Sequence, residues 1–387
     1  MKKILLITDI CLSDKYNAGN KNGFISLCAY LKNNKKNKVD ILNFHQKKPS
    51  NILRKDYNIY HHPDYYNLIY RKITNFIGIK KSLLEYKNSS FRKKITSQIL
   101  KNNYDIVIIE YLENHHLLNI CRKYSQTIIC DLHDLMFLRK ESFKKSGIHP
   151  KNENLLIDAE DEINCIAKFD AVITVENSEQ ELLKKQKLQT KILLCKRIPY
   201  NNENNQILTP DINKFLSIGF IGSAAEFNYH TIHDFIVNVW NPELHKKNHK
   251  LIIAGTVCDA LYKNNIKIMG NHIVLGKVTD VIDFYSLIHL SINPVWSGSG
   301  FKTKNAESLS YGVPIITSPN GIKGLEIINT RYCKVIADNN LGAWEAVVSN
   351  IKEEYIKNIN FKALCKTDFD YHLNSDSCFN ELSEYLE

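Results

Sequence analysis

Short apolar runs alternate with longer amphipathic segments along almost the whole chain of 387 residues. Runs of this length fit strands that are buried on both faces, and the segments between them follow the 3.6-residue period of helices. In the first half the predicted strands are 4–9, 39–44, 105–110, 127–130, 171–175 and 191–195. The predicted helices are 20–32, 112–124, 155–167 and 178–185, the last of which begins on a serine cap. This order predicts a parallel, Rossmann-like sheet with helices on both faces.

A second series of the same kind follows a polar segment, 200–213, whose composition is typical of a linker. Its predicted strands are 215–221, 250–254, 272–275, 290–294, 314–317 and 334–337, and its predicted helices are 231–240, 281–289, 302–311 and 341–351. The chain is long enough for two domains with separate cores. We therefore predict an N-terminal Rossmann-like domain, 1–203, a C-terminal one, 204–365, and a helical tail, 366–387, that packs back on the N-terminal domain.

Composition excludes several classes of protein. No apolar stretch reaches the roughly 18 to 20 residues that a membrane span requires, and Asp9 interrupts the apolar start of the chain too early for a signal peptide. The ten cysteines occur singly, without the spacing of a zinc site or a disulfide framework. We expect reduced cysteines, no structural metal and a cytoplasmic protein.

The net charge of +10 is unevenly distributed. Lysines and arginines gather in the segment 45–104, which we interpret as a basic insert after the second strand, and tyrosines and apolar residues lie among them. Two interpretations stay open: a solvated lysine-rich face, or a surface that contacts anionic lipid headgroups or a phosphate-linked acceptor. We expect no nucleic acid partner, because no DNA-binding or RNA-binding module is visible.

The residues with the clearest chemistry lie between Asn293 and Glu326. A predicted strand ends there, a loop with two glycines follows, and a helix begins near Lys302, so that backbone N–H groups and a positive helix end face the same point. Lys302 and Lys304 stand in the first helical turn, where they would neutralise a bound diphosphate. Glu307 follows, and its carboxylate could accept hydrogen bonds from both hydroxyls of a ribose.

This segment resembles the donor-binding signature of GT-B glycosyltransferases of the family 4 type, the glycosyl transferases group 1. The positions in register are Pro294, Gly298, Gly300, Lys302, Lys304, Glu307, Gly312, Pro314, Gly321, Gly324 and Leu325. The resemblance implies two Rossmann-like domains facing each other across a cleft, and a donor site to which further residues contribute: Gly19, Gly222, Ser223, Lys277, Val278, Gly298, Ser299, Gly300, Phe301 and Thr303. Ser299 departs from the family, many of whose members have a glutamate there, so the resemblance does not fix the transferred sugar or the anomeric outcome.

The N-terminal half offers candidates of its own. His133, in the sequence Cys-Asp-Leu-His-Asp at the end of a predicted strand, stands where the family often has a histidine that faces the donor sugar. A histidine with a purely structural role is the alternative. Arg139, Glu141 and Glu176 are candidates for the acceptor site from their positions after strand ends alone.

The resemblance implies a glycosyltransferase that moves a sugar from a nucleotide-diphosphate sugar to a glycan or lipid-linked acceptor in bacterial surface polysaccharide or lipopolysaccharide synthesis. His133, Lys302, Lys304 and Glu307 would be catalytic, with retention of anomeric configuration. We expect no cofactor and no divalent metal, because the D-x-D pair Asp368 and Asp370 lies in the tail. The protein would be cytoplasmic or peripheral at the inner face of the membrane. A nucleotide-sugar 2-epimerase and a non-catalytic GT-B-like adaptor stay open; an NAD-dependent dehydrogenase is disfavoured, because no G-x-G-x-x-G follows the first strand.

Overall fold

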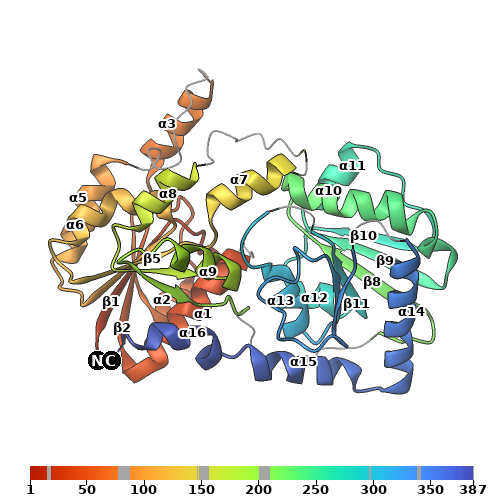
Figure 1. The fold of residues 1–387 in the computed structure, drawn as a ribbon. Helices are drawn as coiled ribbons and strands as arrows, with labels where there is room; N and C mark the ends of the chain where they lie inside the picture. The colour runs from red at the N-terminus through yellow and green to blue at the C-terminus, as the bar shows by residue number, and fades with distance from the viewer. Residues whose placement is uncertain are drawn as a thin grey trace. The chain divides into compact units, whose positions relative to one another are not determined.

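The computed structural model describes residues 1–14, 19–76, 88–145, 147, 157–199, 210–295, 298–337 and 341–386. The chain forms two compact units, each built on its own parallel sheet (Figure 1). Unit 1 comprises Met1–Arg197, Ser299–Phe301 and Ser375–Glu387, and unit 2 comprises Ile198–Gly298 and Lys302–Asn374. The predicted domain boundary at 203/204 falls outside the described residues.

Unit 1 contains a parallel sheet in the order β3-β2-β1-β4-β5-β6-β7. Its strands are β1 (Lys3–Thr8), β2 (Lys38–Asn43), β3 (Asn58–His61), β4 (Ile106–Glu110), β5 (Thr127–Asp131), β6 (Ala171–Thr174) and β7 (Lys191–Leu194). The six predicted strands are confirmed, and the register places Ile4 of β1 between Val39 of β2 and Ile106 of β4. β3 was missed, because it lies inside the segment that we interpreted as a basic insert.

The helices of unit 1 are α1 (Gly19–Asn33), α2 (Asn51–Asp56), α3 (Tyr65–Phe76), α5 (Ser90–Leu100), α6 (Leu118–Cys121), α7 (Met136–Lys145), α8 (Ala159–Ile166), α9 (Asn177–Lys185) and α16 (Ser375–Ser383). The predicted helix 112–124 is instead a 3-10 segment, Leu112–Leu117, followed by α6. The serine cap predicted for α9 is also wrong. Glu176 is the N-cap residue, and its carboxylate accepts the backbone N–H of Ser178 at 3.0 Å.

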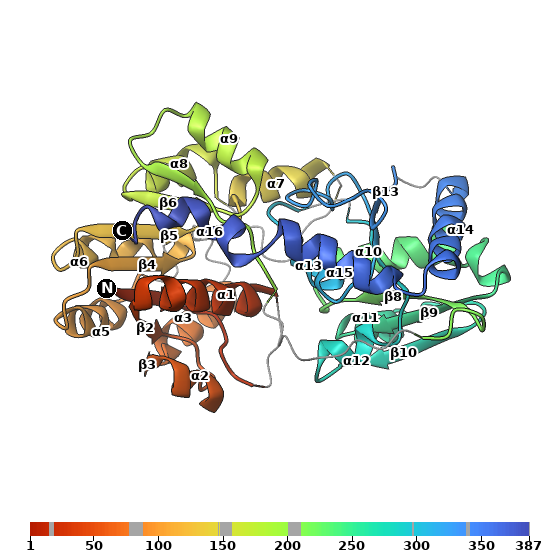
Figure 2. The same cartoon turned by 90° about the horizontal axis from the view of Figure 1, so that it is seen from below.

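The predicted helical tail divides between the two units. α15 (Phe361–His372) belongs to unit 2, whereas α16 belongs to unit 1 and lies beside α1 and β7 (Figure 2). Tyr30 of α1 stacks on Phe379 of α16 with ring centroids 4.9 Å apart. Glu381 accepts the backbone N–H of Leu194 at 2.8 Å. The last helix therefore completes the fold of unit 1.

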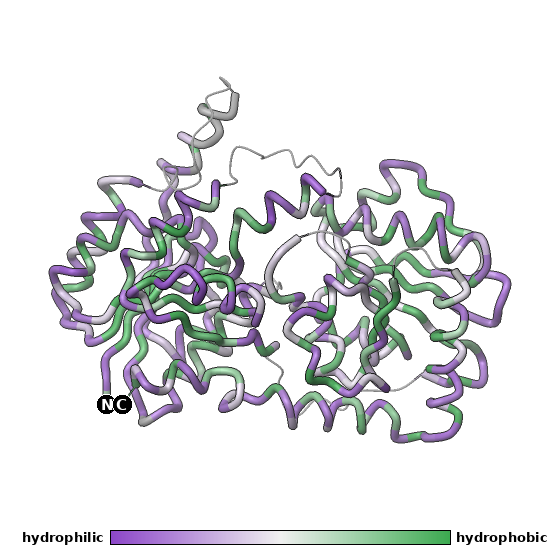
Figure 3. The backbone as a smooth tube through the Cα atoms, viewed as in Figure 1, coloured by the Kyte–Doolittle hydropathy of each residue, from purple (hydrophilic) through white to green (hydrophobic). Residues whose placement is uncertain are grey.

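Unit 2 contains a parallel sheet in the order β10-β9-β8-β11-β12-β13, and all six predicted strands are confirmed. The strands are β8 (Leu216–Ile221), β9 (His249–Ala254), β10 (His272–Gly276), β11 (Leu290–Asn293), β12 (Ile315–Thr317) and β13 (Cys333–Val335). With α15, the helices are α10 (Glu226–Phe235), α11 (Val257–Lys263), α12 (Val281–Tyr285), α13 (Thr303–Ser310) and α14 (Leu341–Lys357). In both units the apolar residues follow the strands and the inner helix faces (Figure 3). Among the described residues, no helix has the length and apolarity of a membrane span.

The segment 45–104 is not simply a solvated insert, as one interpretation of its charge predicted. Arg92 was counted among its surface bases, but its side chain is 3% exposed and forms ion pairs with Asp9 and Asp64. β3 adds to the sheet edge in the same segment. The part that does extend away from the sheet is α3 (Figure 1), and Lys80, Lys81 and Glu85, which follow it, lie outside the described residues.

Candidate functional site

The carboxyl edge of the sheet in unit 2 is shaped by glycines that bring three strand ends together. The backbone N–H of Gly222, just after β8, donates to Ala254 at 3.0 Å, and that of Gly255 donates to Gly276 at 2.7 Å. Gly255 has a φ of +91°, and a Cβ there would lie 2.1 Å from the carbonyl oxygen of Gly222. Only glycine allows this close approach of the strand ends.

Lys304, in the first turn of α13, is the central cation of this edge. Its Nζ donates a hydrogen bond to Oδ1 of Asn228 and lies 5.1 Å from the ring centroid of Phe220. Asn228 in turn donates to Oγ of the predicted donor-binding residue Ser223 at 2.9 Å. Burial lowers the pKa of Lys304 to about 7, since the charged form loses hydration. An anion bound beside it would favour the charged form.

The N-terminus of α13 brings further predicted residues to the same edge. Lys302 is the N-cap residue of α13, Thr303 is its first residue, and both side chains are partly buried. Gly298 precedes them with a φ of +104°, and its carbonyl oxygen accepts Nδ2 of Asn320 at 3.3 Å. Backbone N–H groups in the first turn of a helix favour a negatively charged ligand.

Glu307, one turn further along α13, is held by an aromatic pair. Tyr285 donates its hydroxyl to Oε2 of Glu307 at 3.1 Å, and its ring stacks on Tyr311 with centroids 4.9 Å apart. A carboxylate accepts several hydrogen bonds, so this contact still permits ribose hydroxyls to bind. The remaining predicted residues of unit 2 lie on the loop after β10, where Lys277 is exposed and Val278 packs against the core.

In unit 1, His133 lies just beyond β5 in an unusual backbone conformation. Its φ is +64°, and that of Tyr111, just after β4, is +62°, a region that non-glycine residues seldom occupy. The two rings stack with centroids 4.0 Å apart and planes 12° from parallel. Strained backbone of this kind persists where the surrounding structure fixes a side chain in one orientation.

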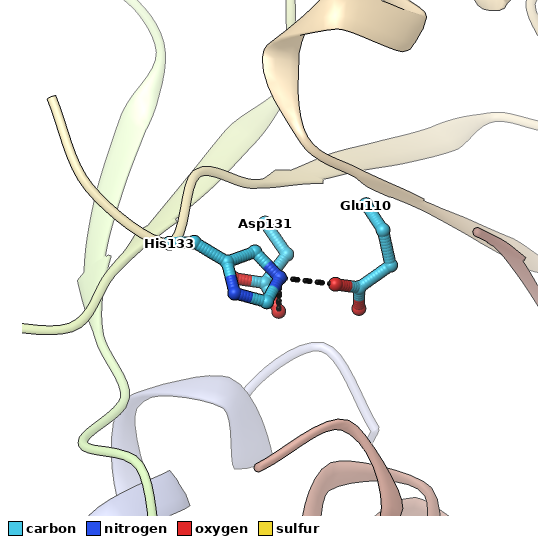
Figure 4. Close-up of side chains that lie close together, drawn as sticks. All are labelled: Glu110, Asp131 and His133. Carbon is cyan, nitrogen blue, oxygen red and sulfur yellow. Dashed lines mark hydrogen bonds and ion pairs between the residues drawn. The ribbon is translucent and has the colours of Figure 1, made fainter. Parts of the chain in front are cut away.

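His133 meets two buried carboxylates at this edge (Figure 4). Its Nε2 lies 2.5 Å from Oε2 of Glu110 and 4.0 Å from Oδ2 of Asp131, and both carboxylates are 0% exposed. Burial, and then the charge of Asp131, raise the pKa of Glu110 to about 7. Burial also disfavours ionised Asp131, yet the adjacent Arg197 guanidinium holds its pKa below the ordinary value.

Glu110, Asp131 and His133 have ligand atoms within 4.8 Å of one another, close enough for a metal ion. The chemistry of the group argues against such an ion. Arg197 already binds Oδ1 of Asp131, and its fixed positive charge would repel a second cation at this place. The arrangement fits a carboxylate–imidazole pair better than a metal centre.

A pocket of about 290 Å³ opens at the same edge of unit 1. It is lined by Asp9, Ile10, Cys11, Asn20, His45, Lys47, Tyr111 and Glu113. Asn20 donates to the hydroxyl of Tyr111 at 3.1 Å. Gly19, which the family resemblance assigns to the donor site, is the first residue of α1, and residues 20–23 continue the helix. Its predicted contact with a donor stays a prediction.

The segment Ser299–Phe301 packs within unit 1. Ser299 donates its hydroxyl to Oδ2 of Asp134 at 2.6 Å, and the backbone N–H of Gly300 donates to Glu179 at 3.0 Å. A Cβ on Gly300 would lie 2.8 Å from Asp134, so this contact requires glycine. Burial, with the nearby charge of Asp134, raises the pKa of Glu179 to about 8. Phe301 is buried.

The three acceptor candidates differ in their surroundings. Arg139 forms an ion pair with Asp134 at 2.5 Å and lines a second pocket of about 70 Å³. Glu141, on α7, is exposed. Glu176 is buried and caps α9, a structural task that accounts for its position. Their contacts with an acceptor stay predictions.

Several residues of these sites were missed. Glu110 is the last residue of β4, and His133 lies just after the end of β5. The position of Glu110 at a strand end could therefore have marked it as a candidate site residue. Tyr285 carried no such signal, because its contact with Glu307 depends on the packing of α12 against α13.

Part of unit 2 is similar to a known protein family. Residues 216–353, which begin at β8 of unit 2, match the family model of Glycosyl transferases group 1. No curated protein matches the sequence.

Solved structures match over the full length of the chain. TarM superposes with a TM-score of 0.71 at 12% identity, over 100% of this chain and 99% of TarM. Anabaena Alr3699/HepE in complex with UDP-glucose gives 0.65 at 12% identity, over 100% and 99%. The lipopolysaccharide outer core galactosyltransferase WaaB in its apo form gives 0.62 at 13% identity, over 99% of both chains. The predicted GT-B fold is therefore confirmed.

Proposed function

We propose that this protein is a glycosyltransferase that uses a nucleotide sugar and that the carboxyl edge of unit 2 binds its donor. Residues 216–353 match the family model of Glycosyl transferases group 1, and the GT-B fold supports the proposal. The observation that carries the proposal is the side chain of Lys304, a partly buried lysine at a helix N-terminus whose Nζ donates to the neutral amide of Asn228. A bound diphosphate would supply the negative charge that this environment favours.

The residues of unit 2 then have distinct tasks. Lys302, Lys304 and the N-terminus of α13 stabilise the charge that grows on the departing nucleoside diphosphate, which is the main catalytic device of the proposed reaction. Glu307, oriented by Tyr285, accepts hydrogen bonds from the ribose. His133 contacts the transferred sugar, as the family resemblance implies. The same resemblance supports retention of anomeric configuration, with Ser299 as the departure.

For the acceptor we propose a lipid-linked glycan, or lipopolysaccharide, at an anionic membrane surface. Four apolar side chains of α3 are more than half exposed: Tyr65 (55%), Tyr66 (68%), Ile69 (57%) and Ile73 (53%). Residues four apart share one face of a helix, so Tyr65, Ile69 and Ile73 form a stripe. The bases in this part of the sequence would attract anionic headgroups. The lipopolysaccharide outer core galactosyltransferase WaaB has the same fold.

Binding of nucleoside diphosphates tests the donor site. UDP, GDP, ADP, CMP and NAD are each added to the protein, and thermal unfolding is recorded. A ligand at 100 times its Kd stabilises the folded protein by about 2.7 kcal/mol. We expect one nucleoside diphosphate to do so. Glu307→Gln should weaken its binding roughly 10- to 100-fold and reduce the stabilisation to about 1.4 to 0.4 kcal/mol.

Glu353→Gln is the matched control, because Glu353 is an exposed glutamate of the same unit on α14, outside the donor-binding segment. It should leave the nucleotide effect unchanged. If no nucleotide stabilises the wild-type protein, the donor proposal fails and a non-catalytic role for the fold gains support. An equal loss of stabilisation by the nucleotide in both variants would show that Glu307 has no specific role in binding it.

Vesicle binding tests the surface of α3. Replacing Tyr65, Tyr66, Ile69 and Ile73 together by serine should reduce co-sedimentation with phosphatidylglycerol vesicles at least about tenfold, because the apolar area that enters the interface is lost. The control replaces two tyrosines and two isoleucines that are exposed in unit 2: Tyr262, Tyr371, Ile356 and Ile359. Equal binding by the two variants would remove the support for a membrane contact through α3.

A further inference from the structure

The contact between Glu110 and His133 fixes which edge of the imidazole is buried. Nε2 faces Oε2 of Glu110 at 2.5 Å, and Oδ2 of Asp131 lies 4.0 Å from the same nitrogen. In Figure 4 both marked contacts meet Nε2, and no described residue forms a hydrogen bond with the other ring nitrogen, Nδ1. The stacked ring of Tyr111 covers one face of the imidazole. His133 can therefore meet a substrate through Nδ1.

The position of one proton determines whether Nδ1 accepts or donates a hydrogen bond. With Glu110 ionised, Nε2 carries the proton and donates it to the carboxylate, so Nδ1 presents a lone pair. With Glu110 protonated, Nε2 accepts a hydrogen bond and Nδ1 carries the ring proton. The first arrangement accepts a hydrogen bond from a hydroxyl group, and the second donates one.

The surroundings of the pair favour the first arrangement above neutral pH. The charged groups that face it are Asp131 and, through Asp131, Arg197. Tyr111 also contacts the pair, and its hydroxyl accepts a hydrogen bond from Asn20; the buried thiols of Cys28 and Cys130 are further titratable groups close enough to interact with Glu110. Because burial raises the pKa of Glu110 to about 7, the Glu110–His133 pair takes up a proton as the pH falls through neutrality, and the form with an unprotonated Nδ1 prevails above it.

We propose that Glu110 is a positioning residue that holds the proton of His133 on Nε2, so that Nδ1 accepts a hydrogen bond from a hydroxyl of the transferred sugar. This inference rests on the proposed function for the identity of the ligand. The pairing of Glu110 with His133 itself does not depend on that function, and it can be measured without substrate.

The first measurement is 15N NMR of the histidine side chains at pH 8 and pH 6, with His133 assigned by comparison with His133→Gln. We expect a protonated Nε2 and an unprotonated Nδ1 at pH 8 in the wild-type protein. Glu110→Gln should yield a mixture of tautomers, because an amide can either accept from Nε2 or donate to it. Glu162→Gln is the matched control, since Glu162 is a buried glutamate of unit 1 whose pKa burial raises to about 7.

The second measurement is transferase activity against pH. Glu110→Gln should lower kcat about 10- to 100-fold with little change in KM for the donor, and should remove the rise in kcat between pH 6 and pH 8. A proton on Nδ1 of wild-type His133 at pH 8 would overturn the inference, and so would the wild-type tautomer in Glu110→Gln. The wild-type spectra give this answer even if the variant does not fold. Absence of activity in the wild-type protein would count against the proposed function alone.

Discussion

Replacing Arg92 by methionine should lower the free energy of unfolding by about 3 to 5 kcal/mol, because it removes the guanidinium that pairs with the buried carboxylate of Asp64 and the partly buried carboxylate of Asp9. Arg92 donates from Nε to Asp64 at 2.6 Å and from its two terminal nitrogens to Asp9 at 2.7 and 2.9 Å. It also donates to Oδ1 of Asn114 at 2.9 Å. These bonds connect α5 to the end of β1 and to the residues just before α3.

Arg122→Met is the matched control. Arg122 also binds a carboxylate through two contacts, at 2.7 and 2.8 Å to Asp170, but its side chain is 40% exposed. An exposed pair contributes about 0 to 1 kcal/mol, so this variant should unfold almost as the wild type does. Both arginines lie in unit 1, whereas all three tryptophans lie in unit 2, so tryptophan fluorescence would not report the unfolding of unit 1. Urea unfolding is therefore followed by far-UV circular dichroism. Equal losses in the two variants would contradict the account of Arg92.

This result also bears on the membrane proposal. Charge reversal at Arg92 would disrupt the fold of unit 1, so weaker vesicle binding by such a variant would say nothing about lipid. Lys93 is partly exposed and Lys94 is exposed, so these two residues are the proper sites for charge reversal in that segment.

The strands were predictable because each central strand is a run of apolar residues buried on both faces, as Ile4–Ile7 illustrates. β3 escaped prediction for the opposite reason. Among the described strands, it is an edge strand that pairs with β2 alone, and Ile59 is its buried residue. A strand at the edge of a sheet can form with few apolar residues. The lysines and arginines around β3 indicated an insert instead.

The candidate site was predictable where its residues are close in sequence. Lys302, Lys304 and Glu307 lie on one helix, and their spacing alone placed them together. The contact between Glu110 and His133 joins the ends of two neighbouring strands, 23 residues apart. Periodicity places both residues at a sheet edge but does not determine that their side chains meet. The buried state of Arg92 depends in the same way on distant partners, Asp9 and Asp64.

Binding of the nucleoside diphosphate that stabilises the protein should weaken as the pH rises from 7 to 9. Lys304 binds phosphate as a cation, and burial lowers its pKa to about 7 in the free protein. A bound diphosphate favours the charged form and raises that pKa, so binding above pH 7 takes up a proton. The association constant should then fall by up to about tenfold per pH unit. Isothermal titration calorimetry measures it directly.

Substitutions at Lys304 test whether the titration of Lys304, and not of another residue, causes the pH dependence of nucleotide binding. Lys304→Met should bind roughly 100-fold more weakly at pH 6, equivalent to about 2.8 kcal/mol, and should show no such pH dependence. Lys304→Arg keeps its charge throughout this range and should also give a flat profile. Lys250→Met is the matched control, because Lys250 lies 4.9 Å from the ring centroid of Phe215 but stands near the start of β9, at the opposite end of the strand from Gly255. It should retain the wild-type profile. A pH dependence that persists in both Lys304 variants would assign the titrating group to another residue and would remove Lys304 from the proposed diphosphate site.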